Sequence, residues 1–174
     1  MKFLRVIMSA MLILSLASIP ASAQSSDGSA WRALAEQLEG GVALDVRVAG
    51  ISPGAHGIHI HAIGACDRPT TVAYSSAGGH FNPTAKQHGR LNPSGWHVGD
   101  LPNIVVDSAT GRGSIKTVVE SLTLQDGLTA LLDADGSAIV VHANRDDERT
   151  DTGPAGPGNS GARVACGVFR VVPP

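Results

Sequence analysis

The fold of this 174-residue chain is decided by the stretch Val42-Ala43-Leu44-Asp45-Val46-Arg47-Val48-Ala49. Its aliphatic residues alternate with small or charged ones, and successive side chains of a β-strand point to opposite faces. Gly40-Gly41 precedes the stretch and Ser52-Pro53-Gly54 follows it, and both are turn signals. The sequence therefore predicts a strand here, with one buried face and one solvated face.

Further strand signals follow along the chain, separated by turns. They are predicted at residues 57–63, 103–107, 114–124, 138–142 and 163–172. Several short strands with little helical periodicity predict an all-β domain, either a sandwich or a barrel. Two long loops interrupt them, at residues 64–103 and 143–162. Loops of this length in a compact domain are normally functional or disordered, so we expect them to carry the site.

One segment has helical spacing instead. Residues 29–40 place Trp31, Leu34 and Leu38 at helical intervals among strong helix formers, and the segment ends at Gly40. Intrinsic propensity alone predicts a helix there.

Composition excludes several classes of protein. The 21 Gly and 10 Pro residues are too many for a helix bundle and show no three-residue Gly period, while a charged fraction of 16% is too low for a charge-driven disordered chain. The formal net charge of −2 provides no basic excess for a phosphate backbone. Nucleic acid is therefore not an expected partner.

The N-terminus resembles an export signal. Lys2 and Arg5 precede an apolar run at residues 6–16, and Ala21-Ser22-Ala23 has the small-x-small pattern of a cleavage site. This predicts a secretory signal peptide over residues 1–23 and a periplasmic or secreted mature domain over residues 24–174. A membrane span is the competing interpretation, but the run is shorter than the roughly 20 residues that a bilayer needs. No membrane association is expected after cleavage.

Export changes the meaning of the two cysteines, Cys66 and Cys166. In an oxidising compartment an even pair favours a disulfide over two thiols or a metal pair. A bridge that closes a loop of about 100 residues would stabilise the fold by up to about 4 to 5 kcal/mol in the chain-entropy model.

Two groups of histidines are placed to bind metal. His59 and His61 share one strand face roughly 7 Å apart, and His142 ends a later apolar strand, so the three could form an imidazole site with an open position that suits copper. The first long loop supplies three further nitrogens and one carboxylate, a set typical of tetrahedral zinc, from His80, His88, His97 and Asp100. Zinc would also order this long loop.

Several spaced blocks of sequence resemble the copper-zinc superoxide dismutases, in particular their exported bacterial branch. The blocks run in family order and cover most of residues 40–172: Gly54-Ala55-His56-Gly57-Ile58-His59-Ile60-His61, Gly78-Gly79-His80-Phe81-Asn82-Pro83, His88-Gly89, His97-Val98-Gly99-Asp100, Val140-Val141-His142 and the stretch at 158–167. The resemblance implies a Greek-key β-sandwich, or flattened barrel, of about seven to eight antiparallel strands with two long functional loops. It also implies the dismutation of superoxide to dioxygen and hydrogen peroxide.

The resemblance implies one copper and one zinc per subunit. Copper would be bound by His59, His61, His80 and His142, and zinc by His80, His88, His97 and Asp100. The shared His80 would bridge the two metals and carry a proton during the reaction.

The resemblance also implies roles for residues around the metals. Arg163 would attract and orient the superoxide anion beside copper, with Arg145 and Lys86 as weaker candidates for the same positive potential. Asp146 would link a copper-ligand imidazole to a zinc-ligand one, and His56 would tie a loop to a strand. Cys66 and Cys166 would form the family's disulfide.

The chain also departs from the family pattern. The family has two strands before the one at residue 42, so residues 24–39 either form a strand against their propensity or leave the barrel without an edge strand. This puts the usual subunit interface in doubt, and a homodimer stays an open expectation. Phe169 stands where the family has Ile or Val. Two other functions compete, a dismutase-like metal-binding module without catalysis and a structural sandwich domain of the cell surface.

Overall fold

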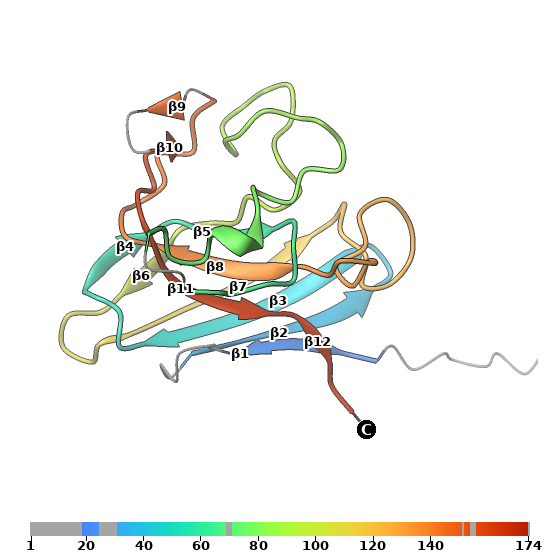
Figure 1. Ribbon diagram of the computed structural model, residues 1–174, viewed down its shortest axis with the longest axis horizontal. Coiled ribbons are helices and arrows are strands. Elements are labelled where there is room, and N and C mark those ends of the chain that lie inside the picture. The colour runs from blue at the N-terminus through green and yellow to red at the C-terminus, as the bar shows by residue number, and fades with distance from the viewer. Residues whose placement is uncertain (1–18, 25–30, 69–70, 151, 154–155, 174) are drawn as a thin grey trace, which may run out of the picture.

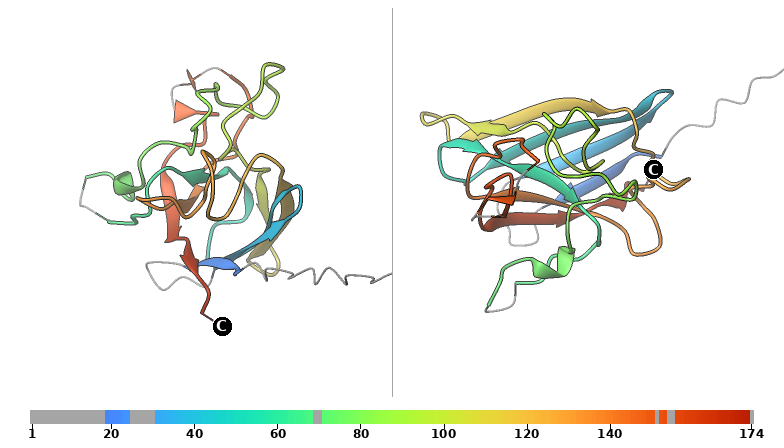
Figure 2. Two further views of the ribbon diagram at one scale, coloured as in Figure 1. Left: turned by 90° about the vertical axis from the view of Figure 1, so that its right-hand side faces the viewer. Right: turned by 90° about the horizontal axis from the view of Figure 1, so that it is seen from above.

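The computed structural model describes residues 19–24, 31–68, 71–150, 152–153 and 156–173, which form antiparallel sheets with almost no helix. The large sheet has seven strands in the order β12 (Arg170–Val171), β1 (Ala21–Gln24), β2 (Arg32–Leu38), β3 (Gly41–Ala49), β7 (Arg112–Val119), β6 (Ile104–Val106) and β4 (Gly54–His56). A second sheet contains β11 (Arg163–Val168), β8 (Ala138–His142) and β5 (Ile58–His61). Together they form a flattened barrel, which confirms the predicted all-β class (Figure 1, Figure 2).

Most of the expected strands are present with shifted ends. The strand expected at 114–124 begins at Arg112 and ends at Val119. The strand expected at 163–172 is divided into β11 and β12 at Phe169, whose ring is buried in the core and whose amide donates to the Ser137 carbonyl at 3.0 Å. In the second long loop, β9 (Thr152–Gly153) and β10 (Gly156–Pro157) form a small hairpin that the sequence did not indicate. The first long loop contains the 3₁₀ turn Ser75–Ala77.

The central strand is β3, as its alternation predicts. Val42, Leu44, Val46 and Val48 are buried in the barrel, while Asp45 and Arg47 point outward. Seven residue pairs join β3 to β2, and eight join it to β7. The aliphatic core therefore lies between β3 and its neighbours on one side and the three-stranded sheet on the other.

The helix predicted from propensity is wrong, because the segment forms β2. Ala33 and Ala35 are buried on one side of this strand, whereas Leu34 and Leu38 are 42% and 41% exposed on the other. Pairing with β1 and β3 satisfies the backbone on both edges of β2, and the small alanines fit the closely packed interior. Tertiary pairing outweighs helix propensity here.

The predicted signal peptide lies mainly outside the described residues, but its expected cleavage site falls within β1. Ala21 and Ala23 are buried, and β1 pairs with β2 on one side and β12 on the other. Among the described residues, no helix has the length and apolar character needed to cross a membrane. Cleavage after Ala23 would remove three of the four residues of β1.

The stability of the barrel should therefore depend on where the mature chain begins. A chain starting at Gln24 should have a free energy of unfolding about 2 kcal/mol lower than one starting at Ile19, since it loses two buried methyl groups and the hydrogen bonds of β1. Urea denaturation of the two metal-free proteins measures the difference. Equal midpoints would show that β1 contributes nothing to stability.

Candidate metal centre

Alternation along β5 places two histidines on the outer face of the three-stranded sheet. Ile58 and Ile60 point into the core, so His59 and His61 point away from it. The free edge of β5 pairs with the first long loop, where the Ile60 amide donates to the Gly99 carbonyl at 2.9 Å. Gly99 permits this approach, because a Cβ there would collide with the Ile60 carbonyl oxygen. The loop covers the histidines, which are fully buried.

Four imidazoles converge in the first group. His59, His61, His80 and His142 each offer one ring nitrogen, and these nitrogens lie within 4.8 Å of one another. The His59 and His80 rings stack with their centroids 4.0 Å apart. His142 ends β8, directly beside β5, and His80 reaches the group from the loop through a bridge to His61.

Three of these four rings are anchored through one nitrogen, and the other nitrogen of each is without a hydrogen-bond partner. His61 Nδ1 donates to the Gly78 carbonyl at 3.0 Å, and His142 Nδ1 donates to the Gly161 carbonyl at 3.1 Å. Nε2 of His59 donates to Asp146 Oδ2 at 2.6 Å. The opposite nitrogens, His59 Nδ1, His61 Nε2 and His142 Nε2, are buried without a hydrogen-bond partner. Three buried lone pairs that share one location fit a metal ion.

A second group surrounds Asp100. Its Oδ1 lies 2.9 Å from His80 Nδ1 and 3.3 Å from His97 Nδ1, and its Oδ2 lies 3.1 Å from His88 Nδ1. His88 Nδ1 is a further buried nitrogen of this group, close to the carboxylate. By distance alone the second group contains His59 rather than His97. However, the His59 Nε2 is occupied by Asp146, whereas His97 Nδ1 lies 3.4 Å from His80 Nδ1.

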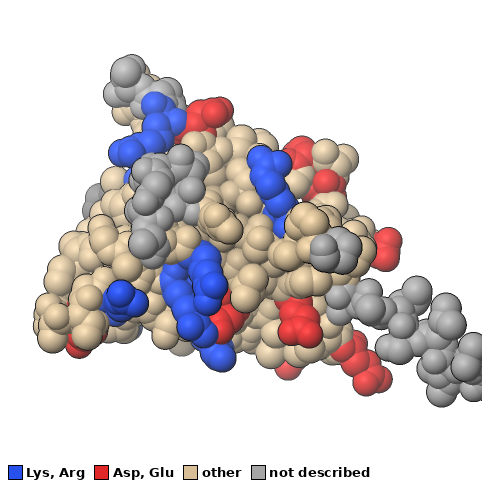
Figure 3. Space-filling model, turned by 90° about the horizontal axis from the view of Figure 1, so that it is seen from below, with Lys and Arg blue, Asp and Glu red and all other residues tan. Residues whose placement is uncertain are grey.

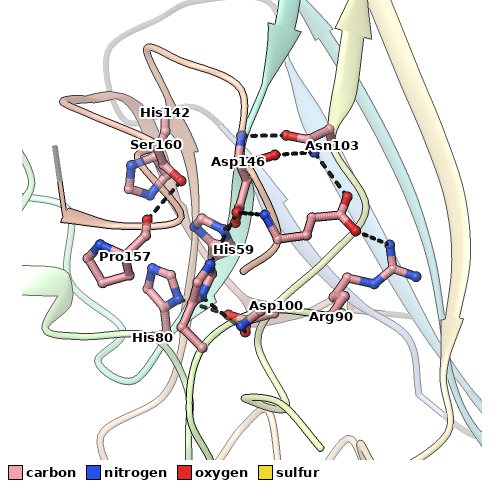
Figure 4. Close-up of polar contacts among 12 residues, drawn as sticks. His59, His80, Arg90, Asp100, Asn103, His142, Asp146, Pro157 and Ser160 are labelled. Atoms are coloured by element: carbon pink, nitrogen blue, oxygen red, sulfur yellow. Dashed lines mark hydrogen bonds and ion pairs between the residues drawn. The ribbon is translucent and has the colours of Figure 1, made fainter. Parts of the chain in front are cut away.

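Asp146 joins the two groups from outside. Its carboxylate accepts from His59 Nε2 at 2.6 Å and faces His88 Nε2 at 3.1 Å (Figure 4). Asn103 fixes the backbone of Asp146 from both sides, accepting from its amide at 2.7 Å and donating to its carbonyl at 2.9 Å. Gly158 has no side chain at this point, and a Cβ there would collide with the Asp146 carboxylate. The sequence did not indicate Asn103, since an isolated Asn near a strand has no motif.

Burial keeps the histidines of the first group in the neutral form that can bind a metal ion. Burial lowers the pKa of His59 to about 3, of His61 to about 2 and of His142 to about 4. These rings are therefore neutral at pH 7, which is the form that binds a cation. Burial raises the pKa of Asp100, but hydrogen bonds from His80, His88 and His97 outweigh it and hold that pKa well below its usual range.

His88 shows the opposite shift. Burial lowers its pKa, but its interactions with Asp100 and Asp146 outweigh burial and raise the pKa to about 9. In the metal-free protein this ring is a cation between two carboxylates. A metal ion in the second group would replace that proton.

Arg163 stands at the edge of the first group. It is the first residue of β11 and pairs in register with His142. Its Nη1 donates to the Tyr74 carbonyl and its Nη2 to the Gly78 carbonyl, both at 2.6 Å. The disulfide between Cys66 and Cys166 attaches the same loop to β11. The guanidinium is thus held by the loop that the disulfide fastens.

Three other predicted residues, His56, Arg145 and Lys86, lie outside the two histidine groups. His56 in β4 bonds the Ser52 carbonyl through Nε2 and the His142 carbonyl through Nδ1, both at 2.8 Å, so it links a turn to the end of β8. Arg145 and Lys86 are exposed, and neither makes an ion pair within the described ranges.

A flattened all-β barrel with two adjoining groups of His and Asp side chains that could each hold a metal ion defines a class of protein, those with two neighbouring metal sites. The family model of copper/zinc superoxide dismutase matches residues 30–169. Over 132 residues the chain is 44% identical to the superoxide dismutase [Cu-Zn] of Caulobacter vibrioides, covering 75% of this chain and 72% of that protein. It is 41% identical to superoxide dismutase [Cu-Zn] 2 of Aquifex aeolicus, covering 77% and 75%. The chain belongs to the copper/zinc superoxide dismutase family, and its histidine and aspartate groups are placed for copper and zinc.

Solved structures show the same fold under more than one name. A SOD-like protein from Bacillus subtilis superposes with a TM-score of 0.74 at 34% identity, covering 84% of this chain and 96% of that one. The clock protein EA4 superposes with a TM-score of 0.75 at 32% identity, covering 90% and 96%. Family membership thus establishes the fold and the metal chemistry, while catalysis needs its own argument.

Acid should destabilise the metal-free protein. Burial keeps His59, His61 and His142 neutral in the folded protein, whereas the same residues take up protons below about pH 6.5 in the unfolded chain. The free energy of unfolding should therefore fall from about pH 6.5 toward pH 4. His88 acts with the opposite sign, because its raised pKa makes its contribution disappear between pH 6.5 and 9. Urea midpoints at pH 5, 7 and 9 should therefore be highest at pH 7. A midpoint that does not change from pH 7 to pH 5 would contradict the assignment of neutral histidines.

Loss of the disulfide should lower the free energy of unfolding and loosen the loop that holds Arg163. The double variant Cys66→Ser/Cys166→Ser should lose about 2 to 5 kcal/mol of the free energy of unfolding, because its unfolded chain is no longer cross-linked over about 100 residues. Denaturation of oxidised and reduced wild-type protein provides the matched control. The reduced wild type should behave like the double variant.

Proposed function

We propose that this chain is a superoxide dismutase, which converts two superoxide ions and two protons to dioxygen and hydrogen peroxide. The observation that carries the proposal is the convergence of buried, unpartnered imidazole nitrogens beside a fixed guanidinium. The first feature supports a redox metal, and the second supports an anionic substrate.

Each group of ligands suits one of the two family metals. His59, His61, His80 and His142 would hold copper, since four imidazoles form a nitrogen-rich set. His80, His88, His97 and Asp100 would hold zinc, since three imidazoles and one carboxylate form a closed tetrahedral set. When bound, copper supplies the one-electron couple that oxidises one superoxide and reduces the next, and zinc supplies fixed positive charge.

His80 serves both groups and can therefore hold a proton of the reaction. Its Nδ1 faces Asp100 at 2.9 Å, so its Nε2 is left for the histidines of the first group. A ring clamped from one side by the zinc set can gain and release a proton at Nε2 without moving away. This position is suitable for delivering that proton to the developing peroxide.

Arg163 attracts and orients the substrate. Two carbonyls fix its guanidinium next to His142, and burial lowers its pKa without removing its charge at neutral pH. In a chain with a formal net charge of −2, a cation fixed at the site concentrates an anion locally.

The competing function is a dismutase-like metal-binding module without catalysis. One curated relative, 40% identical over 136 residues, is named superoxide dismutase-like protein YojM of Bacillus subtilis, so likeness to the family does not itself establish activity. The complete ligand groups of this chain, together with Arg163, favour the enzyme.

We also propose export to the periplasm or the exterior, with residues 1–23 as a signal peptide. The charged and apolar N-terminal pattern supports it, and so does the disulfide, because such bridges persist in oxidising compartments. The protein would then remove superoxide outside the cytoplasm.

Metal analysis combined with kinetics tests the enzyme. The purified chain, loaded with copper and zinc, should bind one of each and remove superoxide in pulse radiolysis. His142→Ala should lose copper, retain zinc and lower the rate at least about 100-fold, because the first group loses an anchored ligand.

Arg163→Gln separates substrate attraction from metal binding. This variant should retain both metals and lower kcat/KM about tenfold, with a weaker dependence on ionic strength than the wild type. If the wild type binds both metals without removing superoxide, the binding module is the correct function. If it binds neither metal after loading, the assignment of both ligand groups is wrong.

A further inference from the structure

A second polar feature lies on the outer face of the large sheet. A hollow of about 490 Å³ lies over β3 and β7, and its lining includes four charged residues together with Gly113 and Ser114. Its charged residues are Asp45, Arg47, Arg112 and Lys116. We call it the basic hollow. The space-filling view from below shows Lys and Arg side chains in several separate places, and the largest group has an acidic side chain beside it (Figure 3).

The strand register brings these cations together. Arg32 on β2 pairs directly with Arg47 on β3, and Arg47 pairs with Ser114 on β7. Lys116 pairs with Asp45, and Arg112 pairs with Ala49 at the end of the same two strands. Like charges placed directly opposite in an antiparallel pair are destabilising, and the two hydrogen bonds from Arg47 to Asp45 offset part of the repulsion between Arg32 and Arg47.

One carboxylate is shared among these cations. Asp45 binds Arg47 through both oxygens at 3.0 Å, and its Oδ2 lies 3.3 Å from Lys116 Nζ. Within the described part of the chain, neither Arg32 nor Arg112 has an ion pair. The next carboxylate on the outer face of β2 is Glu36, about 13 Å along the strand from Arg32. Three cations and one carboxylate line the hollow, with Arg32 on the neighbouring strand, and they leave a local excess of positive charge on a chain whose net charge is negative.

The basic hollow is separate from the metal centre. The histidines lie on the outer face of the three-stranded sheet, whereas Arg47 and Lys116 lie on the outer face of the large sheet, across the aliphatic core. Substrate attraction by Arg163 does not involve these residues.

We propose that the basic hollow binds a phosphate group, either as free phosphate or as the headgroup of an anionic lipid. Guanidinium groups offer paired donors that match the oxygens of a phosphate, and an ammonium adds a point charge. Gly113 and Ser114 line the same space. Its concave shape, Arg112 without an ion pair in the described part of the chain, and two further cations that share the single carboxylate of Asp45 distinguish it from an ordinary solvated strand face.

Phosphate titration of the copper- and zinc-loaded protein tests the proposal at constant ionic strength. Amide NMR signals of Gly113 and Ser114 should shift and saturate with inorganic phosphate, but not with chloride. The double variant Arg112→Gln/Lys116→Gln should weaken this binding at least tenfold. Arg170→Gln removes an exposed cation from β12, outside the hollow, and should bind as the wild type does.

Vesicle sedimentation distinguishes the two sources of phosphate. If the lipid headgroup is the ligand, the wild type should sediment with phosphatidylglycerol vesicles and not with phosphatidylcholine vesicles, and the double variant should remain in the supernatant. Phosphate binding without vesicle binding would identify a soluble phosphate. The proposal is overturned if inorganic phosphate does not shift the Gly113 and Ser114 signals and the wild type does not sediment with phosphatidylglycerol vesicles. It is also overturned if the double variant binds phosphate and vesicles as well as the wild type does.

Discussion

Alternation along β5 is the constraint on which the rest of the structure depends. One face of four consecutive residues must fill the aliphatic core with Ile58 and Ile60, and the other face then presents His59 and His61 outward as a pair. A one-residue slip in the register between β5 and β8 would bury the histidines in the core and expose the isoleucines. Barrel folding and ligand placement are therefore a single event.

The two long loops supply side chains that surround the histidines of β5. Backbone pairing with Gly99 and Phe81 holds the first long loop against the edge of β5, which brings His80 and Asp100 to the histidines. Asp146 closes the second long loop onto the same cluster through His59 and His88. The core contains few aromatic side chains, and the loops are instead ordered by buried polar contacts, one disulfide and the affinity of the ligand groups for metal.

The strongly alternating strands could be predicted because their pattern reflects local burial. Propensity did not predict the segment that became β2, since Trp31, Leu34 and Leu38 suit a helix and only pairing with β1 and β3 makes a strand better, while the family resemblance left a strand there as one of two alternatives. Likewise, β1 has the sequence pattern of a cleavage site, because small alanines suit both that pattern and a crowded barrel interior. The support from Asn103, Tyr74 and Gly78 was not predictable, because an isolated amide and backbone carbonyls leave no signature in sequence.

The sequence by itself determined the chemistry, because ligand type and spacing are local. His59-Ile60-His61 must share a face, and the order of the later histidines indicates two metals. Only the tertiary structure decided how the parts act together. It left one nitrogen free on each anchored ring, placed His80 between two ligand groups and fixed Arg163 beside His142. Each of these depends on contacts between residues 17 to 100 positions apart, which only the closed barrel and its loops bring into reach.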